Sequence, residues 1–251
     1  MSCHKLCICA ATMRDPFQDL TELVTFCDHA TTGELGFAVH HNSIDNNLGV
    51  VGSYQQILDN VTQDGEIRWE LLAFIHDDVI CRERGWDERV LHEFEDPEVG
   101  LVGFGGARWH GVSELYKRPY ELTQLVRGDY MSNTDDAEVH GARFTGSCDV
   151  AVLDGYVLIV RRDLLDRAGG WRGLASGCDF YCYDYALSAM ARRLGYRIRL
   201  VGVRCHHLGG RTSVAAGALP ATSPEAREAA HRWFYETYRD VMPARVRIDR
   251  G

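Results

Sequence analysis

Short apolar runs alternate with amphipathic segments through the first hundred residues of the chain. Four runs have the length of buried strands, and they lie at 6–11, 35–40, 71–75 and 99–104. The segments between them have helical spacing, and they lie at 15–28, 53–61 and 86–94. Strands that alternate with helices favour a mostly parallel sheet with helices on both faces. We therefore predict an α/β, doubly wound fold.

The second half of the chain begins with a break in this pattern. Polar, aromatic and glycine residues mix over 105–148, and an insertion of this length in a compact domain is usually functional or mobile. Further strands are predicted at 150–153, 156–160 and 198–203. Further helices are predicted at 162–168, 185–194 and 223–240.

Composition narrows the class of protein. A chain of 251 residues with 45% apolar content can bury one full core, so we expect a single α/β domain. The longest apolar runs are too short to span a bilayer, and the N-terminus has no signal-like stretch, so we expect a cytoplasmic protein. Nine cysteines, an odd number scattered along the chain, favour reduced thiols.

Acidic residues directly after a buried strand are the first candidates for chemistry. The run 71–75 leads into His76, Asp77 and Asp78. Ligands of open parallel sheets bind beyond the carboxyl ends of the strands, and paired carboxylates there suit a hard cation that also contacts a phosphate. The alternative is that Asp77 and Asp78 only cap the following turn.

Two later features lie in comparable positions. Asp184 lies at the start of an amphipathic helix, where the commoner role of such a residue is an N-cap or a first-turn acid favoured by the helix dipole. His206 and His207 follow the strand at 198–203, beyond a basic stretch, which indicates a metal or phosphate role.

In their order and spacing, these motifs resemble the inverting family 2 glycosyltransferases with a GT-A fold, from Lys5 to about Gly210. The His76-Asp77-Asp78-Val79 segment is similar to the acidic motif of that family. The resemblance implies that Asp78 binds the metal and that Asp77 lies near the ribose or diphosphate. Further matching segments are Asp154-Gly155, 156–160, Arg161-Arg162-Asp163 and Ala168-Gly169-Gly170-Trp171.

The same resemblance implies roles for the remaining site residues. Asp184 would be the general base, with Asp154 as a rival base or as the group that orients a donor hydroxyl. Tyr183 departs from the family, which usually has glutamate before the catalytic aspartate. His206 or His207 would complete the metal site, with a slight preference for His207. Nucleotide binding would fall to four residues after the first two strands, Thr12, Arg14, Asn42 and Asp45.

The implied enzyme uses Mn or Mg and a nucleotide-diphosphate sugar, with a UDP-sugar favoured. Its GT-A catalytic domain would comprise residues 1–210, with 105–148 as an inserted segment on the acceptor side. Residues 211–251 would form a loop and a C-terminal helix packed on the same domain.

Charge distribution bears on the acceptor. Residues 1–150 carry 11 Lys/Arg against 26 Asp/Glu, a balance of −15, whereas residues 151–251 carry 16 against 10, a balance of +6. The basic part, together with Arg108, Trp109, Lys117 and Arg118, could hold a polyanion. A hydroxymethylated base in DNA, as in bacteriophage DNA-modifying glycosyltransferases, is therefore one candidate acceptor. A saccharide or a small glycoside is favoured over nucleic acid, because the whole chain is acidic.

Three alternatives belong to other classes. A sugar nucleotidyltransferase would need a glycine-rich, lysine-containing loop after the first strand, which residues 10–14 lack. A noncatalytic sugar- or nucleic-acid-binding module would not need Asp78 and Asp184. Structural zinc has two candidate ligand sets of non-standard spacing, namely Cys3, His4, Cys7 and Cys9, and Cys178, Cys182, Cys205 and His206.

Overall fold

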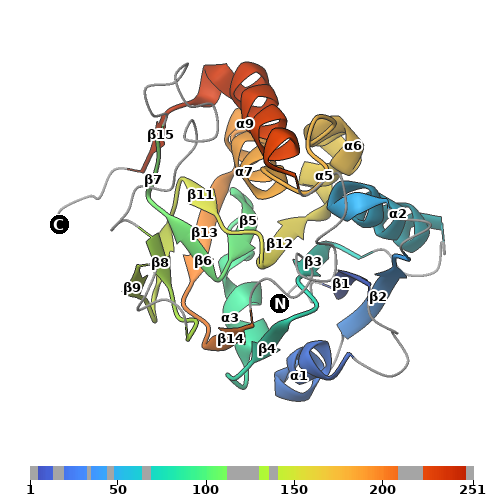
Figure 1. Ribbon diagram of the computed structural model, residues 1–251. Helices are drawn as coiled ribbons and strands as arrows, with labels where there is room; N and C mark the ends of the chain where they lie inside the picture. The colour runs from blue at the N-terminus through green and yellow to red at the C-terminus, as the bar shows by residue number, and fades with distance from the viewer. Residues whose placement is uncertain are drawn as a thin grey trace.

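A seven-stranded sheet forms the centre of the computed structural model (Figure 1). The structure describes residues 5–13, 20–32, 35–43, 48–63, 69–111, 130–135, 141–208 and 223–246. The strand order is β10-β13-β5-β12-β3-β1-β2. In chain order these strands are β1 Leu6–Thr12, β2 Leu35–His41, β3 Leu71–Ile75, β5 Val99–Gly103, β10 Ser147–Asp149, β12 Val157–Arg161 and β13 Arg197–Val201.

Most strands of this sheet run in one direction. Strand β1 pairs in parallel with β2 and β3, and β13 pairs in parallel with β5. Strand β12 is antiparallel to both β3 and β5, and β10 is antiparallel to β13. The predicted strands at 6–11, 35–40, 71–75, 99–104, 156–160 and 198–203 are all present within two residues of their expected bounds.

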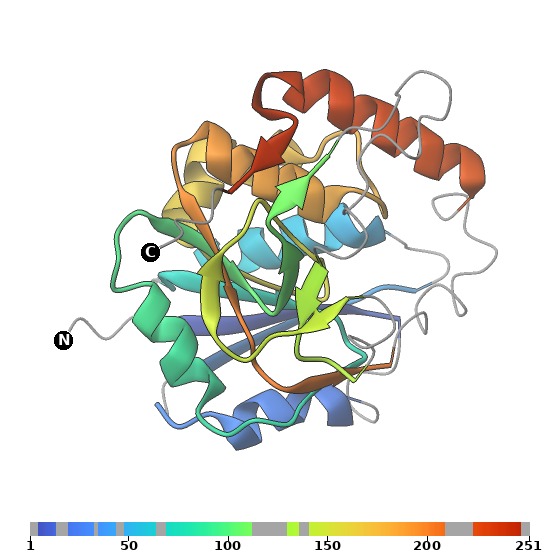
Figure 2. The ribbon, with the colours of Figure 1, turned by 90° about the vertical axis from the view of Figure 1, so that its left-hand side faces the viewer.

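Helices cover both faces of the sheet (Figure 2). One face carries α2 Gly49–Gln63, α5 Arg162–Ala168, α6 Gly170–Leu174, α7 Tyr183–Arg193 and α9 Pro224–Tyr238, followed by the short η3 Arg239–Val241. The other face carries α1 Thr21–His29 and α3 Trp86–Glu93. This arrangement confirms the predicted α/β fold class. Among the described residues, no helix is both long enough and apolar enough to cross a membrane.

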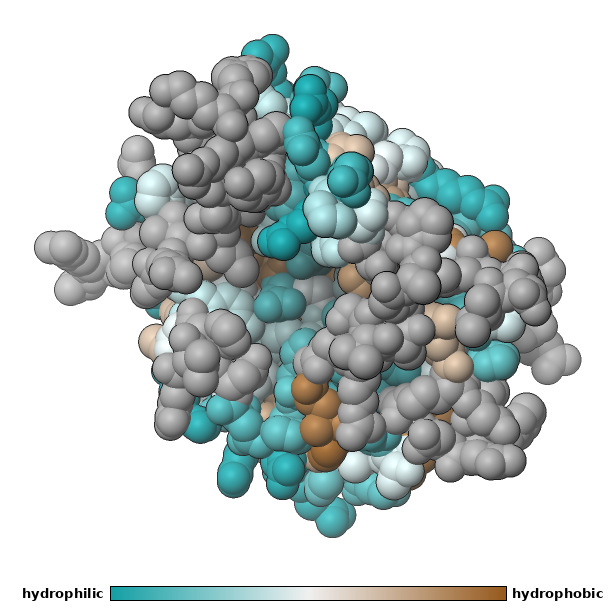
Figure 3. All heavy atoms as spheres, viewed as in Figure 1, coloured by the Kyte–Doolittle hydropathy of each residue, from teal (hydrophilic) through white to brown (hydrophobic). Residues whose placement is uncertain are grey.

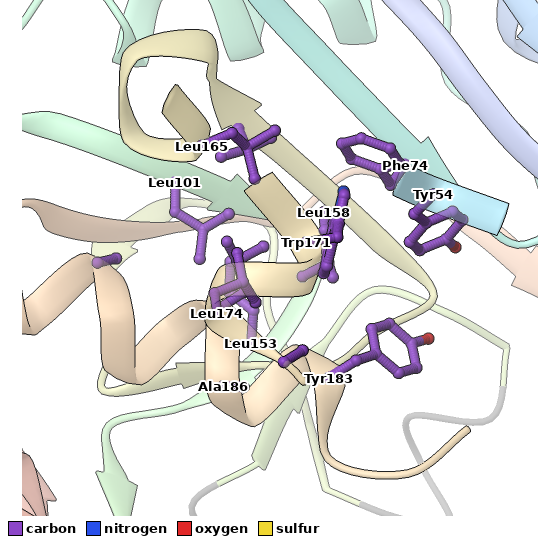
Figure 4. Close-up of a cluster of buried hydrophobic side chains, with 14 of the residues drawn as sticks. Tyr54, Phe74, Leu101, Leu153, Leu158, Leu165, Trp171, Leu174, Tyr183 and Ala186 are labelled. Atoms are coloured by element: carbon purple, nitrogen blue, oxygen red, sulfur yellow. The ribbon is translucent and has the colours of Figure 1, made fainter. Parts of the chain in front are cut away.

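Alternation along the strands divides the buried side chains between two cores. Successive strand residues point to opposite faces, so Phe74 joins the core under α2, α6 and α7, whereas Ala73 and Ile75 join the core under α1 and α3. In the first core, the Trp171 ring lies 5.1 Å from Tyr54 and 4.9 Å from Phe74 between ring centroids (Figure 4). This aromatic cluster fixes the start of α7 against the sheet.

The segment from 105 to 148 contains short strands that the sequence pattern did not reveal. They are β6 Gly105–Ala107, β7 Trp109–His110, β8 Tyr130–Ser132 and β9 Ala142–Arg143. Strands β6, β8 and β9 form a small sheet with β11 Val152–Leu153, in the order β11-β6-β8-β9. Strand β7 instead pairs with β15 Ala244–Arg245. Strands of two or three residues are too short to show a two-residue period, which explains why they escaped prediction.

The C-terminal helix shares the first core. Ser223 caps α9, since its hydroxyl accepts the Ala226 amide at 3.0 Å and Pro224 follows as the first helical residue. Phe234 and Tyr238 are buried against α7, and the Tyr238 hydroxyl donates to the Leu174 carbonyl. The first part of the helix predicted at 15–28 lies outside the described residues.

Candidate functional site

The carboxyl ends of β1 and β3 bring the predicted acidic motif together with the N-terminal candidates. After Ile75 the chain turns through His76, Asp77 and Asp78, and the Val79 amide donates to the His76 carbonyl at 3.3 Å. The short strand β4 Val79–Cys81 follows. The face of the molecule in Figure 3 is hollowed near its centre, with hydrophilic residues around the hollow.

Asp77 is held from the first strand. Its side chain is buried, and its Oδ2 accepts the Thr12 hydroxyl at 2.6 Å. Thr12 is the last residue of β1, so the contact joins the two strand ends where a nucleotide would lie. The structure thus brings together Thr12 and Asp77, two residues predicted to bind the donor.

Asn42 lies beside this pair, and its hydrogen bonds are made within the protein. Its amide N–H donates to the Thr12 carbonyl at 2.8 Å. Its side-chain nitrogen donates to the Ser53 hydroxyl at 2.7 Å, and its side-chain oxygen accepts the Leu48 amide at 3.2 Å. These bonds fix the start of α2, so contact with a nucleotide base remains a prediction for Asn42. Arg14 and Asp45, the other two predicted donor-binding residues, lie outside the described residues.

Asp78 lies in a group of three potential metal ligands. His76, Asp78 and His207 each offer one donor atom, and these atoms all lie within 4.8 Å of one another. Strand β14 Cys205–His207 pairs antiparallel with β4 and places His207 opposite Val79. The His207 Nε2 is therefore 3.4 Å from Asp78 Oδ1.

Electrostatics at this group favour a bound cation. Burial alone would raise the pKa of Asp78, but its hydrogen bond with His207 and the nearby imidazoles of His76 and His207 outweigh burial and lower that pKa. Burial, followed by the proximity of His207, lowers the pKa of His76. An ionised carboxylate beside a neutral imidazole is the protonation state that binds a metal.

His206 does not belong to this group. Its Nδ1 lies 2.6 Å from Asp135 Oδ2, on the side of the strand away from Asp78. Adjacent strand residues point to opposite faces, which accounts for the separation of the two histidines. The alternative zinc set of Cys178, Cys182, Cys205 and His206 is not assembled either, since His76, Asp78 and His207 are the one metal-ligand group within the described ranges.

Asp184 and Asp154 form the second part of the site. Asp184 lies in the first turn of α7, where its Oδ1 accepts the Tyr185 amide at 2.9 Å. Burial, and secondarily the charge of Asp154, raise the pKa of Asp184 to about 7. Asp154 Oδ2 accepts the Tyr130 hydroxyl at 3.2 Å. A carboxylate with a pKa near neutrality can accept a proton from a hydroxyl group.

Three residues of the site were not predicted for the roles that the structure gives them. His76 is one of the three potential metal ligands. The signal for this role in the sequence was its position as the first residue of the acidic motif. The Tyr183 hydroxyl is 2.6 Å from His76 Nε2. The Tyr156 ring stacks on His207 with centroids 5.1 Å apart. The available signal for Tyr183 was its position, where the resembling family has glutamate, whereas Tyr156 begins an apolar run and was predicted only as part of that strand.

Comparisons with known proteins identify the family of the chain and similar folds. The sequence model of a glycosyltransferase-like family matches residues 36–213. No match was found among curated proteins.

Two solved structures are similar in fold. One is the mannosyltransferase PcManGT from Pyrobaculum calidifontis in complex with GDP-Man and Mn²⁺, at 12% identity and TM-score 0.51, covering 92% of this chain and 69% of that chain. The other is GalNAc-T7 with UDP, GalNAc and Mn²⁺, at 9% identity and TM-score 0.54, covering 95% of this chain and 57% of that chain. The chain thus spans little more than half the length of GalNAc-T7. At these identities the similarity concerns the fold, which is the expected GT-A fold. Because the family match spans residues 36–213, the chain belongs to the glycosyltransferase-like family.

Proposed function

We propose that the protein is a metal-dependent, inverting glycosyltransferase that moves a sugar from a nucleotide-diphosphate donor to an acceptor hydroxyl. The observation that carries this proposal is the grouping of His76, Asp78 and His207 within 4.8 Å at the carboxyl end of β3. Asp184, a carboxylate suited to proton transfer, lies at the head of α7 in the same site.

The donor set fits a divalent metal. Two imidazoles and one carboxylate suit Mn²⁺ better than Mg²⁺, because Mg²⁺ prefers oxygen ligands almost exclusively. If these three residues held the metal, diphosphate oxygens could occupy its remaining coordination positions. Mn²⁺ also accompanies the nucleotide in the structures of PcManGT and GalNAc-T7. A bound ion would stabilise the negative charge that develops on the leaving diphosphate.

The protein residues would divide the remaining work. Thr12 and Asp77 lie where the nucleotide would bind, and their mutual hydrogen bond of 2.6 Å presets that surface. Asp184 would accept the proton of the acceptor hydroxyl as that oxygen attacks the anomeric carbon. Asp154, whose charge raises the pKa of Asp184, would orient a donor hydroxyl. Attack from the face opposite the diphosphate inverts the anomeric centre.

The described arginines favour a saccharide or small glycoside over nucleic acid as the acceptor. Arg197 contacts Asp96 at 2.6 Å, and Arg199 contacts Glu93 at 2.7 Å. Arg193 pairs with a carboxylate of η3, which leaves its charge compensated as well. A polyanion requires cations that are free to contact phosphates, and intramolecular pairing removes much of the expected basic surface. Trp109, 40% exposed, is available to stack on either a sugar or a base.

The first experiment screens UDP-, GDP- and dTDP-sugars for binding and turnover with Mn²⁺ or Mg²⁺, with and without hydroxymethylated DNA and a panel of saccharides. Wild type should bind one donor only with metal, and Asp78→Ala should lose this binding. His207→Ala should lose it too, whereas the neighbouring His206→Ala should retain it.

Three outcomes separate the possibilities. DNA-stimulated turnover would identify a modified base as the acceptor, and a product of retained anomeric configuration would refute inversion. Failure to bind any donor would refute the transferase proposal and favour a binding module.

A further inference from the structure

Tyr183 is a buried residue with a fixed position beside the potential metal ligands. It begins α7, and its side chain is 6% exposed. Its ring meets Tyr54 edge-on at 5.9 Å and lies 6.2 Å from Trp171, between ring centroids (Figure 4). Packing on these two rings determines where the hydroxyl points.

Gly155 provides the space for that hydroxyl. A Cβ atom at position 155 would lie 2.4 Å from the Tyr183 hydroxyl oxygen and 2.9 Å from Cζ, closer than such atoms can approach. The Tyr183 hydroxyl reaches the Gly155 carbonyl at 3.5 Å and His76 Nε2 at 2.6 Å. The glycine therefore permits one tyrosine oxygen to contact both groups.

The contacts of Tyr183 allow two hydrogen-bond arrangements, because its hydroxyl can donate either to His76 Nε2 at 2.6 Å or to the Gly155 carbonyl at 3.5 Å. A phenol has one hydrogen to donate, and the Gly155 carbonyl can only accept. When Tyr183 donates to Gly155, its oxygen accepts the Nε2–H of His76, which leaves the Nδ1 lone pair of His76 free for a metal. Metal-binding histidines commonly use such a partner on the second nitrogen to fix tautomer and ring orientation.

We propose that Tyr183 is a positioning residue that holds His76 as the Nε2–H tautomer and presents His76 Nδ1 to the metal. This inference rests on the proposed metal site of the transferase. It also gives the departure from glutamate at position 183 a physical role, because the tyrosine oxygen accepts a hydrogen bond from the histidine that heads the acidic motif.

Two measurements on the full-length protein test the role of Tyr183. The first is the Mn²⁺ dissociation constant from electron paramagnetic resonance titration, without donor. Tyr183→Phe should weaken Mn²⁺ binding about tenfold, the lower end of losses seen when such a partner is removed. Gly155→Ala should weaken it as well, because the added methyl displaces the same hydroxyl.

The second measurement is the ¹⁵N NMR spectrum of the histidine rings in metal-free protein. Wild-type His76 should show a single tautomer protonated at Nε2, and Tyr183→Phe should show a mixture or the other tautomer. Tyr238→Phe is the matched control, since it removes a buried tyrosine hydroxyl that bonds to the Leu174 carbonyl instead. The control should bind Mn²⁺ as wild type does and should keep the His76 signals.

The outcomes distinguish this inference from the proposed function. If wild type binds Mn²⁺, Asp78→Ala does not, and Tyr183→Phe binds as tightly as wild type with an unchanged tautomer, the positioning role is refuted and the metal site stands. If wild type itself does not bind Mn²⁺, both the metal site and the positioning role are refuted. A loss confined to Tyr183→Phe and Gly155→Ala supports the proposal.

Discussion

Replacing Asp184 with asparagine should stabilise the fold while it abolishes turnover. Burial and the charge of Asp154 raise the pKa of Asp184 to about 7. An ordinary aspartate has a pKa of about 3.9, and one pKa unit corresponds to about 1.4 kcal/mol, so three units set an upper limit of about 4 kcal/mol. Because the Asp184 side chain is half-buried, solvent screens part of this electrostatic free energy. We expect the asparagine variant to gain about 2 kcal/mol at pH 8.

The gain must depend on pH in a defined direction. Between about pH 4 and pH 7 the folded protein retains the Asp184 proton while the unfolded chain has released it, so the stability of wild type falls as pH rises. Asparagine does not titrate, and the advantage of Asp184→Asn therefore grows over this window and is constant above it. At pH 5 less than half of the gain should be present.

Urea unfolding at pH 5 and pH 8, with a chelator and no donor, measures both quantities. Asp28→Asn removes the same charge from an exposed position on α1 and serves as the control, with a change below about 0.5 kcal/mol expected. The reasoning is refuted if Asp184→Asn is no more stable than wild type at pH 8, or if its advantage is the same at both pH values.

Three further predictions follow from the site and its support. If Asp184 is the base, kcat/KM should rise tenfold per pH unit up to about pH 7 and then level off, and a profile flat from pH 5 to 8 would exclude it. Thr12→Val removes the 2.6 Å bond to Asp77 and should weaken nucleotide binding, measured by calorimetry, by about 1 kcal/mol; unchanged affinity would show that the bond is not needed. Trp171→Ala should cost about 3–5 kcal/mol of unfolding free energy in urea, because it empties the centre of the aromatic cluster; a loss below 1 kcal/mol would contradict the assigned packing.

The strand and helix pattern was readable from the sequence because each element has a periodic surface to bury. The run 71–75 is apolar throughout, as expected of a central strand covered on both faces, and the residues directly after it were the natural candidates for a site. Order and spacing of the later motifs then identified the family. The short strands between 105 and 148 carry too few residues to show a period, and only pairing with β11, with β15 and with one another defines them.

The assembly of the site was decided by tertiary structure. The sequence offered both His206 and His207 with only a slight preference for His207, and the pairing of β14 with β4 turns His207 toward Asp78 and His206 toward Asp135. Contact between His76 and Tyr183 joins residues 107 positions apart and depends on the packing of α7 against β11 and β13.

The availability of the basic residues in the C-terminal part was likewise decided by the tertiary structure. The composition gives the number of arginines but not their partners. In the folded chain, Arg197 and Arg199 form ion pairs with acidic residues from distant parts of the sequence. Local sequence determines which surfaces a segment must bury, because that requirement repeats along the segment itself. Which polar groups finally meet depends on strand register and long-range packing, which no local pattern encodes.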